Sequence, residues 1–180
     1  MGEKVVTLIS KEAIEKRIEE MAREISADYA GRELFLVCVL KGAFIFAADL
    51  MRGLTVDTRV DFVDVSSYGK GMKSSAQMTL VLDLQDSIED KDVLIIEDIA
   101  DTGRSIDFLK RHIEAKKPRT VKLCTLLDKP GSRVLPHISP DYTGFIIPDK
   151  FVVGFGLDFA QRYRNLPFVG YLDFEDDSVE

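Results

Sequence analysis

The chain has 180 residues and a net charge of −7, because 31 acidic side chains outnumber 24 basic ones. Hydrophobic residues make up 46% and charged residues 31%, which is globular composition and excludes disordered and fibrous classes. At roughly 150 residues per domain, the length fits a single domain. The longest apolar run, residues 34–40, is far below the ~18 residues of a membrane helix. We expect one globular domain with no membrane partner, and the negative charge argues against nucleic acid.

Both cysteines, Cys38 and Cys124, lie inside apolar runs, and no CxxC pair occurs. This placement is typical of buried thiols in a reducing compartment. The opening residues, MGEKVVTLIS, lack the apolar stretch of a secretory signal. We therefore expect a cytoplasmic protein.

Strand-like and helix-like segments alternate along the chain. In chain order, the patterns predict a strand at 5–9, a helix at 11–30, a strand at 34–40, a helix at 43–51, strands at 56–66, 79–84 and 92–96, a helix at 105–115, and strands at 121–127, 145–147, 151–154 and 168–172. Ser10 is a good N-cap for the first helix. The run at 34–40 has no polar alternation, which predicts a strand buried on both faces. The alternation predicts an α/β fold with a mainly parallel, Rossmann-like sheet flanked by helices.

In such a sheet the carboxyl ends of the strands meet at one edge, and ligands bind outside that edge. We therefore expect functional side chains just after Leu40, Ile96, Leu127 and Val153.

The stretch EDIADTGRS, residues 97–105, is the most informative part of the sequence. It joins a buried strand, expected to end at Glu97 and Asp98, to the start of a helix. Free N–H groups at a helix start attract phosphate, and Gly103 lets the backbone come close to it. Adjacent acids can hold sugar hydroxyls or a hard cation. One loop could thus bind a phosphate, a ribose and Mg²⁺.

A simpler interpretation of the same loop is that Asp101 or Thr102 caps the helix while the other acids are only solvated. Other nucleotide motifs do not settle the choice. The chain has no GxxxxGK[ST], and its two GxG pairs lack the third glycine of GxGxxG. It also has no GxSxG and no zinc-ligand pattern of histidine and cysteine.

The EDIADTG stretch resembles the ribose-phosphate signature of the purine phosphoribosyltransferases. Four further segments agree with that family in order and spacing, namely LKGAFIFAADL at 40–50, SSYG at 66–69, LLDKP at 126–130 and PDKFVVGFGLDFAQRYRNLP at 148–167. The resemblance covers nearly the whole chain and is strongest to the bacterial hypoxanthine(-guanine) phosphoribosyltransferases. It implies transfer of the 5-phosphoribosyl group from phosphoribosyl pyrophosphate (PRPP) to N9 of hypoxanthine, and of guanine, in purine salvage. Mg²⁺ is the implied cofactor.

The resemblance also implies roles for individual residues. Asp101 acts at purine N7 as general base or acid, and Lys129 donates to purine O6, which suits a donor-only ammonium. The implied metal ligands are Glu97, Asp98 and Asp158. The implied substrate-binding residues are Lys41, Gly42, Ser67, Tyr68, Glu97, Asp98, Thr102, Gly103, Arg104, Ser105, Lys129, Phe151, Val152, Asp158 and Arg164.

The same resemblance implies a core at about 30–147, a hood from the chain ends at about 1–15 and 148–175, and a mobile lid at about 66–78. It further implies a strained or cis peptide between Leu40 and Lys41, and a homodimer or homotetramer.

Two alternatives belong to other functional classes. The first is an RNA-binding attenuation regulator on the same fold, which the EDIADTG loop, Lys129 and the negative net charge oppose. The second is a receiver-like phosphorylation domain, which explains neither the lid nor the segment at 148–167.

Overall fold

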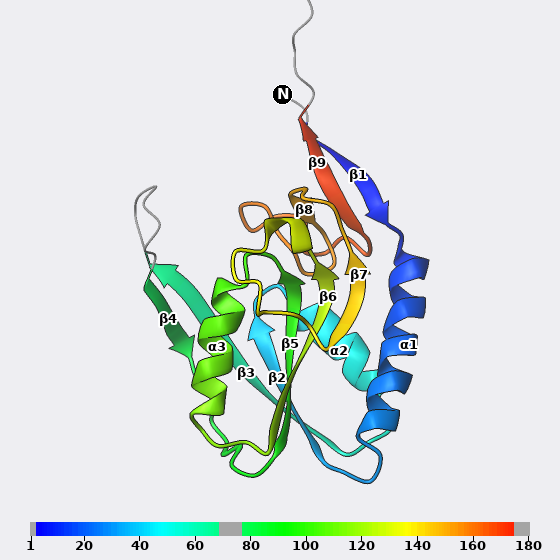
Figure 1. Cartoon of the computed structure of the whole chain (residues 1–180). Coiled ribbons are helices and arrows are strands. Elements are labelled where there is room, and N and C mark those ends of the chain that lie inside the picture. Colours follow the sequence, from blue (N-terminus) through cyan, green and yellow to red (C-terminus); the bar gives the residue numbers. More distant parts are fainter. Residues whose placement is uncertain (1–2, 69–76, 175–180) are drawn as a thin grey trace, which may run out of the picture.

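The computed structural model of the chain describes residues 3–68 and 77–174 (Figure 1). Within these residues, a six-stranded sheet in the order β4-β3-β2-β5-β6-β7 forms the centre. All neighbouring strands are parallel except the antiparallel pair of β3 and β4. The strands are β2 (Leu34–Leu40), β3 (Thr58–Tyr68), β4 (Gln77–Leu82), β5 (Asp92–Ala100), β6 (Thr120–Asp128) and β7 (Tyr142–Ile146). The predicted α/β fold with a mainly parallel sheet is therefore confirmed.

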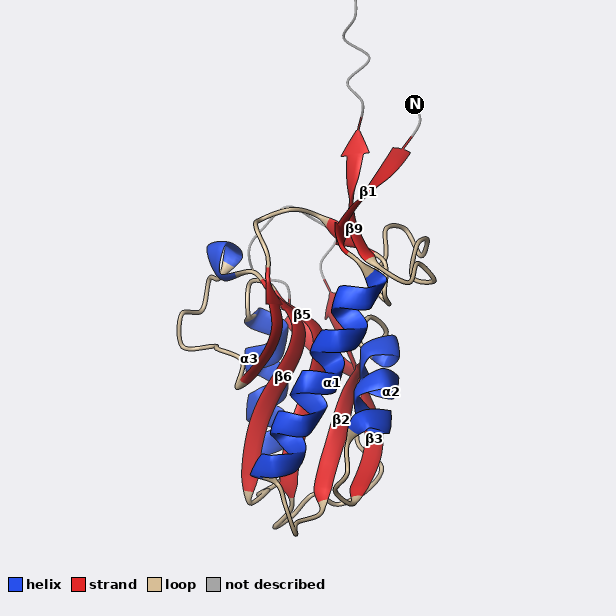
Figure 2. Cartoon of the chain, turned by 90° about the vertical axis from the view of Figure 1, so that its right-hand side faces the viewer, coloured by secondary structure: helices blue, strands red, loops and turns tan. Residues whose placement is uncertain are grey.

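Helices cover both faces of this sheet (Figure 2). The helices α1 (Lys11–Asp28) and α2 (Phe44–Gly53) lie on one face, and α3 (Arg104–Glu114) lies on the other. Ser10 caps α1, as predicted, by accepting a hydrogen bond of 3.3 Å from the backbone N–H of Ala13. The side chains that α1 buries against the sheet lie three or four residues apart along one side of the helix, namely Ile14, Ile18, Met21, Ala22 and Ile25. No helix of the described ranges is long and apolar enough to cross a bilayer.

The central strand β2 separates two apolar cores. Leu36 and Cys38 belong to the core under α1 and α2, whereas Val37 and Val39 belong to the core under α3. Because both faces of β2 are covered, its sequence has no polar alternation, as predicted.

A second, antiparallel sheet joins the two ends of the chain. Its strands are β1 (Glu3–Ile9), β9 (Val169–Phe174) and β8 (Val152–Val153), in that order. This sheet stands beyond the carboxyl ends of β5, β6 and β7 (Figure 1). The strand predicted at 151–154 is thus only two residues long.

One element differs from its prediction in a way that shapes the site. The apolar strand predicted at 92–96 continues to Ala100, so Glu97 and Asp98, expected at its end, lie within it. The reason is the neighbouring strand β6, which remains paired with β5 up to Ala100 and Asp128. On the other side, pairing with β2 stops at Ile96. The last residues of β5 therefore have a strand on one side only.

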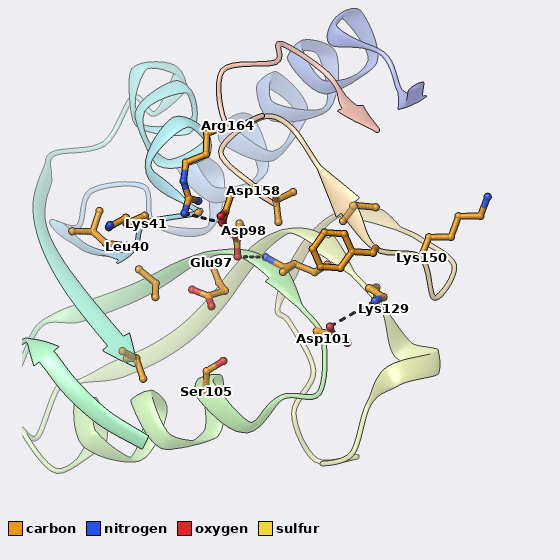
Figure 3. Close-up of a pocket in the computed structure, with 17 residues that line it drawn as sticks. Leu40, Lys41, Glu97, Asp98, Asp101, Ser105, Lys129, Lys150, Asp158 and Arg164 are labelled. Carbon is orange, nitrogen blue, oxygen red and sulfur yellow. Dashed lines mark hydrogen bonds and ion pairs between the residues drawn. The ribbon is translucent and has the colours of Figure 1, made fainter. Parts of the chain in front are cut away.

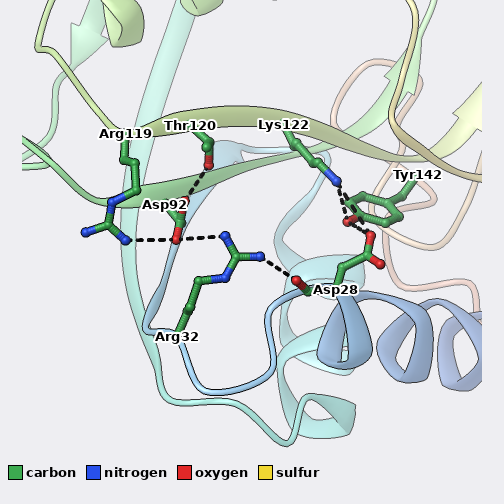
Figure 4. Close-up of polar contacts among 7 residues, drawn as sticks. All are labelled: Asp28, Arg32, Asp92, Arg119, Thr120, Lys122 and Tyr142. Atoms are coloured by element: carbon green, nitrogen blue, oxygen red, sulfur yellow. Dashed lines mark hydrogen bonds and ion pairs between the residues drawn. The ribbon is translucent and has the colours of Figure 1, made fainter.

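The opposite, amino-terminal edge of the sheet is tied by a buried carboxylate (Figure 4). Asp92, whose side chain is fully buried, accepts hydrogen bonds from Thr120 at 2.7 Å, Arg119 at 3.2 Å and Arg32 at 3.3 Å. A buried carboxylate needs such partners. These contacts hold β5, β6 and the segment after α1 together, far along the strands from the carboxyl edge.

Candidate active site

A cavity of about 360 Å³ lies at the carboxyl edge of the sheet (Figure 3). Its walls come from the ends of β2, β5 and β6, the start of α3, and the chain around β8. The predicted site residues that line it are Lys41, Gly42, Glu97, Asp98, Asp101, Ser105, Lys129, Phe151, Val152, Asp158 and Arg164. Residues from four separate stretches of the chain, 41–42, 97–105, 129 and 151–164, thus meet at one place, and the first three lie at the carboxyl ends of parallel strands that end at one edge.

Two adjacent carboxyl groups stand on the part of β5 that β2 does not cover. Oε2 of Glu97 is buried and has no hydrogen-bond partner. Burial raises the pKa of Glu97 well above its ordinary value, and the neighbouring Asp98 adds to this. Burial also raises the pKa of Asp98, to about 6, although the N–H of Ile99 donates to this carboxylate at 2.7 Å. A cation or hydroxyl donors would relieve both groups.

The backbone after β2 passes directly against this pair. A Cβ atom added to Gly42 would lie 1.5 Å from Oδ2 of Asp98, and one added to Gly156 would lie 2.1 Å from the carbonyl oxygen of Gly42. Both close approaches therefore require glycine. The peptide between Leu40 and Lys41 is cis.

Asp158 and Arg164 enter the cavity from the segment between β8 and β9. They form an ion pair, with 2.8 Å between Arg164 Nη2 and Asp158 Oδ1. Arg164 Nη1 also donates to the carbonyl oxygen of Gly156 at 2.7 Å. The guanidinium is thereby fixed opposite Glu97 and Asp98 (Figure 3).

Lys129 follows β6 and carries the cation nearest to Asp101. Its side chain is only 8% exposed, and its Nζ lies 3.6 Å from Asp101 Oδ2 and 2.9 Å from Asp149 Oδ1. Its backbone N–H donates to the carbonyl oxygen of Ala100 at 2.9 Å, which fixes the end of β6 beside the end of β5.

Phe151 forms the aromatic side of the cavity. Its side chain is 59% exposed, and it makes an edge-to-face contact with Phe159 at 5.7 Å between ring centroids. A ring with one open face over a cavity is suited to stacking on a planar ligand. The next residue, Val152, is buried and pairs with Tyr171 in the second sheet.

The helix α3 has a glycine at its N-cap position, while Thr102 Oγ1 accepts a hydrogen bond of 3.5 Å from the backbone N–H of Arg104, the first helical residue. Gly103 occupies the N-cap position, with a φ of 85° that favours glycine. The capping interpretation of Asp101 and Thr102 is therefore wrong as a description of the N-cap. Ser105 lines the cavity, whereas Thr102 and Gly103 in the adjoining loop and Arg104 at the start of α3 are not among its lining residues.

A partly buried arginine that the sequence reasoning missed, Arg133, joins this loop to the segment after β6. Arg133 donates to the carbonyl oxygens of Ala100 at 3.0 Å and Ile138 at 2.7 Å, and it pairs with Asp128. Ala100 thus accepts from both Arg133 and Lys129, and it directly precedes Asp101. These contacts of Arg133, which we call the clamp, set the spacing of the two loops that carry Lys129 and Asp101.

Other lining residues were also missed, among them Lys150, whose ammonium lies 3.6 Å from the ring centroid of Tyr171. Its place directly before Phe151 is the signal that could have found it. The predicted lid, 66–78, lies mostly outside the described residues. For Ser67 and Tyr68 the structure gives only their backbone pairing with Met78 and Gln77 in β4.

Comparison with known proteins decides the family. The model of the phosphoribosyl transferase domain matches residues 6–160. The chain belongs to the phosphoribosyltransferase family. This phosphoribosyltransferase is 45% identical to the hypoxanthine-guanine phosphoribosyltransferase of Bacillus subtilis, over 92% of the chain and 91% of that relative. The crystal structure of a hypoxanthine-guanine phosphoribosyltransferase from Bacillus anthracis superposes with a TM-score of 0.88 at 41% identity, covering 96% of this chain and all of that one.

A further relative of this phosphoribosyltransferase is larger. The chain is 49% identical to the bifunctional protein TilS/HprT of Listeria innocua over 92% of its own length, but it spans only 25% of that protein.

Proposed function

We propose that the chain transfers the 5-phosphoribosyl group of PRPP to N9 of hypoxanthine, and of guanine, in purine salvage, with release of pyrophosphate. The observation that carries the proposal is the cavity itself, which brings together a buried carboxylate pair, a buried ammonium and an open aromatic ring. Relatives that match the chain over most of both lengths are named for this activity.

The base would lie on Phe151, with the Lys129 ammonium at O6 and Asp101 at N7. O6 is an acceptor and N7, when it carries the purine proton, is a donor on the same edge of a 6-oxopurine; the 3.6 Å between Lys129 Nζ and Asp101 Oδ2 allows both groups to contact that edge. The backbone at Val152 would read the opposite edge.

The ribose and its phosphates would occupy the rest of the cavity. Glu97 and Asp98 would accept hydrogen bonds from the ribose hydroxyls, and the loop from Asp101 to Ser105, with Thr102, Gly103 and Arg104 between, would bind the 5′-phosphate at the start of α3. The pyrophosphate would lie against Lys41, Gly42 and Arg164. The sheet of β1, β9 and β8 would act as a hood, and residues 66–78, including Ser67 and Tyr68, as a lid that excludes water.

The carboxylates also fit a divalent cation such as Mg²⁺. Oε2 of Glu97 is buried and has no hydrogen-bond partner within the protein. Because buried polar atoms are normally satisfied, this oxygen is suited to bind a ligand. The described residues contain no cluster of three or more metal-ligating side chains, so a cation at Glu97, Asp98 or Asp158 would also use substrate oxygens and water. When bound, it supplies positive charge to the leaving pyrophosphate.

In the transfer, N9 attacks C1′ as the bond from C1′ to the pyrophosphate oxygen breaks, through an oxocarbenium-like transition state. The Asp101 carboxylate would take the proton from N7, which leaves the electron pair at N9 available for the new bond. The cationic groups Lys41 and Arg164 would stabilise the charge that develops on pyrophosphate.

Two further features belong to this proposal. The exposed apolar side chains Val60, Phe62 and Val81 on β3 and β4 support a homodimer or homotetramer, which sedimentation velocity would test. The two cysteines are free and buried, which supports action in the reducing cytoplasm.

The test is a spectrophotometric assay with PRPP and Mg²⁺ in which hypoxanthine, guanine, xanthine, adenine and uracil are offered separately. We expect nucleotide formation with hypoxanthine or guanine, and its loss on addition of a chelator. Absence of transfer to every base would refute the proposal, and RNA binding would then be measured.

A further inference from the structure

Lys129 has a second carboxylate partner that the proposed chemistry does not use. Its Nζ lies 2.9 Å from Asp149 Oδ1, closer than the 3.6 Å to Asp101 Oδ2. Asp149 comes from the turn between β7 and β8, two residues before Phe151. The Lys129 side chain is 8% exposed and that of Asp149 is 68% exposed, so the aspartate reaches the buried ammonium from the solvent side.

A lysine ammonium has three N–H donors on a flexible chain, and nothing in its own bonding fixes where they point. In this cavity one direction is taken by Asp149, at hydrogen-bond distance, whereas the 3.6 Å to Asp101 Oδ2 is a looser ion-pair contact. The hydrogen bond from Lys129 lowers the pKa of Asp149, which keeps that carboxylate charged at neutral pH. A further N–H donor of Lys129 therefore remains for a ligand.

We infer that Asp149 is a positioning residue for the base: it holds the Lys129 ammonium so that the free N–H faces the cavity, where the O6 of a 6-oxopurine accepts it. The inference rests on the proposed function. Asp101 cannot do this alone, since it is the more distant partner and is occupied at N7 when the base is bound.

The arrangement also bears on which purines are accepted. A donor held in one direction favours an oxygen at position 6, whereas an amino group there leaves the ammonium without an acceptor. Loss of Asp149 frees the ammonium to turn or withdraw. Binding of 6-oxopurines should then weaken, while binding of PRPP, whose phosphates do not meet Lys129, should not.

The experiment compares steady-state kinetics of the wild type with Asp149→Asn, which keeps the shape and removes the charge. We expect KM for hypoxanthine to rise about fivefold, the effect of losing one partly exposed ion pair, while KM for PRPP is unchanged. Asp149→Glu, which restores the charge, should recover most of the loss. The matched control is Glu19→Gln, the same change at an exposed site on α1.

Calorimetric titration supplies a measurement that does not need turnover. Asp149→Asn should bind inosine 5′-monophosphate about fivefold more weakly and ribose 5-phosphate as tightly as the wild type does. Equal weakening of both ligands would mean that Asp149 supports the cavity in general, and values equal to those of Glu19→Gln would mean that it does nothing for the base; either result overturns the inference. A wild type that transfers to no 6-oxopurine refutes the proposed function itself, before any variant is compared.

Discussion

The contact between Gly42 and Asp98 makes a single methyl group a sharp probe of the site. In Gly42→Ala the new Cβ would lie 1.5 Å from Asp98 Oδ2, whereas ordinary contact begins at 3.4 Å. The φ of Gly42 is not in the left-handed region, so alanine meets no backbone penalty there. The carboxyl group is the movable partner, and it must retreat by about 2 Å.

A displacement of about 1 Å in a reacting group can cost about 10²-fold in rate, so we expect Gly42→Ala to lower kcat/KM by at least about 10²-fold. The fold should survive, because the overlap falls on the end of one side chain rather than on backbone. The assay is initial-rate formation of nucleotide from hypoxanthine and PRPP, with thermal unfolding measured on the same samples.

Gly131→Ala is the matched control, since a Cβ at Gly131 meets nothing within 4 Å. It makes the same change to the unfolded chain, so the two variants differ only in the contact. If Gly42→Ala retains the activity of Gly131→Ala, then Asp98 is not needed where the structure holds it, and the reasoning fails.

Three other changes have defined outcomes. Asp101→Asn should lower kcat by about 10²–10⁴-fold in the same assay while calorimetric binding of the nucleotide survives, because only the proton transfer at N7 is lost; full activity would remove Asp101 from the chemistry. Arg133→Met leaves the largely buried Asp128 without its partner and should cost about 3 kcal/mol in urea denaturation, and an unchanged midpoint would contradict the clamp. The hydrogen bond from Tyr142 lowers the pKa of Asp28, so its stabilisation is present at neutral pH and lost as pH falls through the folded-state value. Tyr142→Phe should therefore lower Tm at pH 7, and its difference from the wild type should narrow below about pH 4; a difference that does not change with pH would show that the carboxylate is not involved.

Much of the fold follows from local patterns in the sequence. The bounds of β2 agree with the prediction at both ends, because a strand covered on both faces must be apolar throughout. The Ser10 cap places the start of α1 at Lys11, as predicted, whereas the helix ends at Asp28, two residues before the predicted end at residue 30. The apolar pattern does not predict where a strand ends when pairing with a neighbouring strand sets its length. β5 continues to Ala100, beyond the predicted range 92–96, because β6 pairs with it up to that residue.

The residues around the cavity were found by resemblance, and geometry added what no local pattern contains. The contact of Gly42 with Asp98 joins chain segments that are far apart in sequence, and the residues around either one do not predict that contact. Arg133 and Asp149 were missed for the same reason: each is an ordinary charged residue near a turn until the fold sets it against Ala100 or Lys129.

The carboxyl edge of this sheet is organised at the expense of folding stability. Glu97 keeps a buried oxygen without a partner, and Asp98 stands beside it with a raised pKa, although apolar side chains there would fold more easily. At the amino-terminal edge the chain satisfies a fully buried carboxylate, Asp92, with three donors. The same polypeptide thus pairs a buried acid at the amino-terminal edge and leaves Glu97 Oε2 without a partner in the cavity. That contrast supports the proposed role of this carboxylate pair in ligand binding, since a partner for Glu97 Oε2 must come from outside the chain.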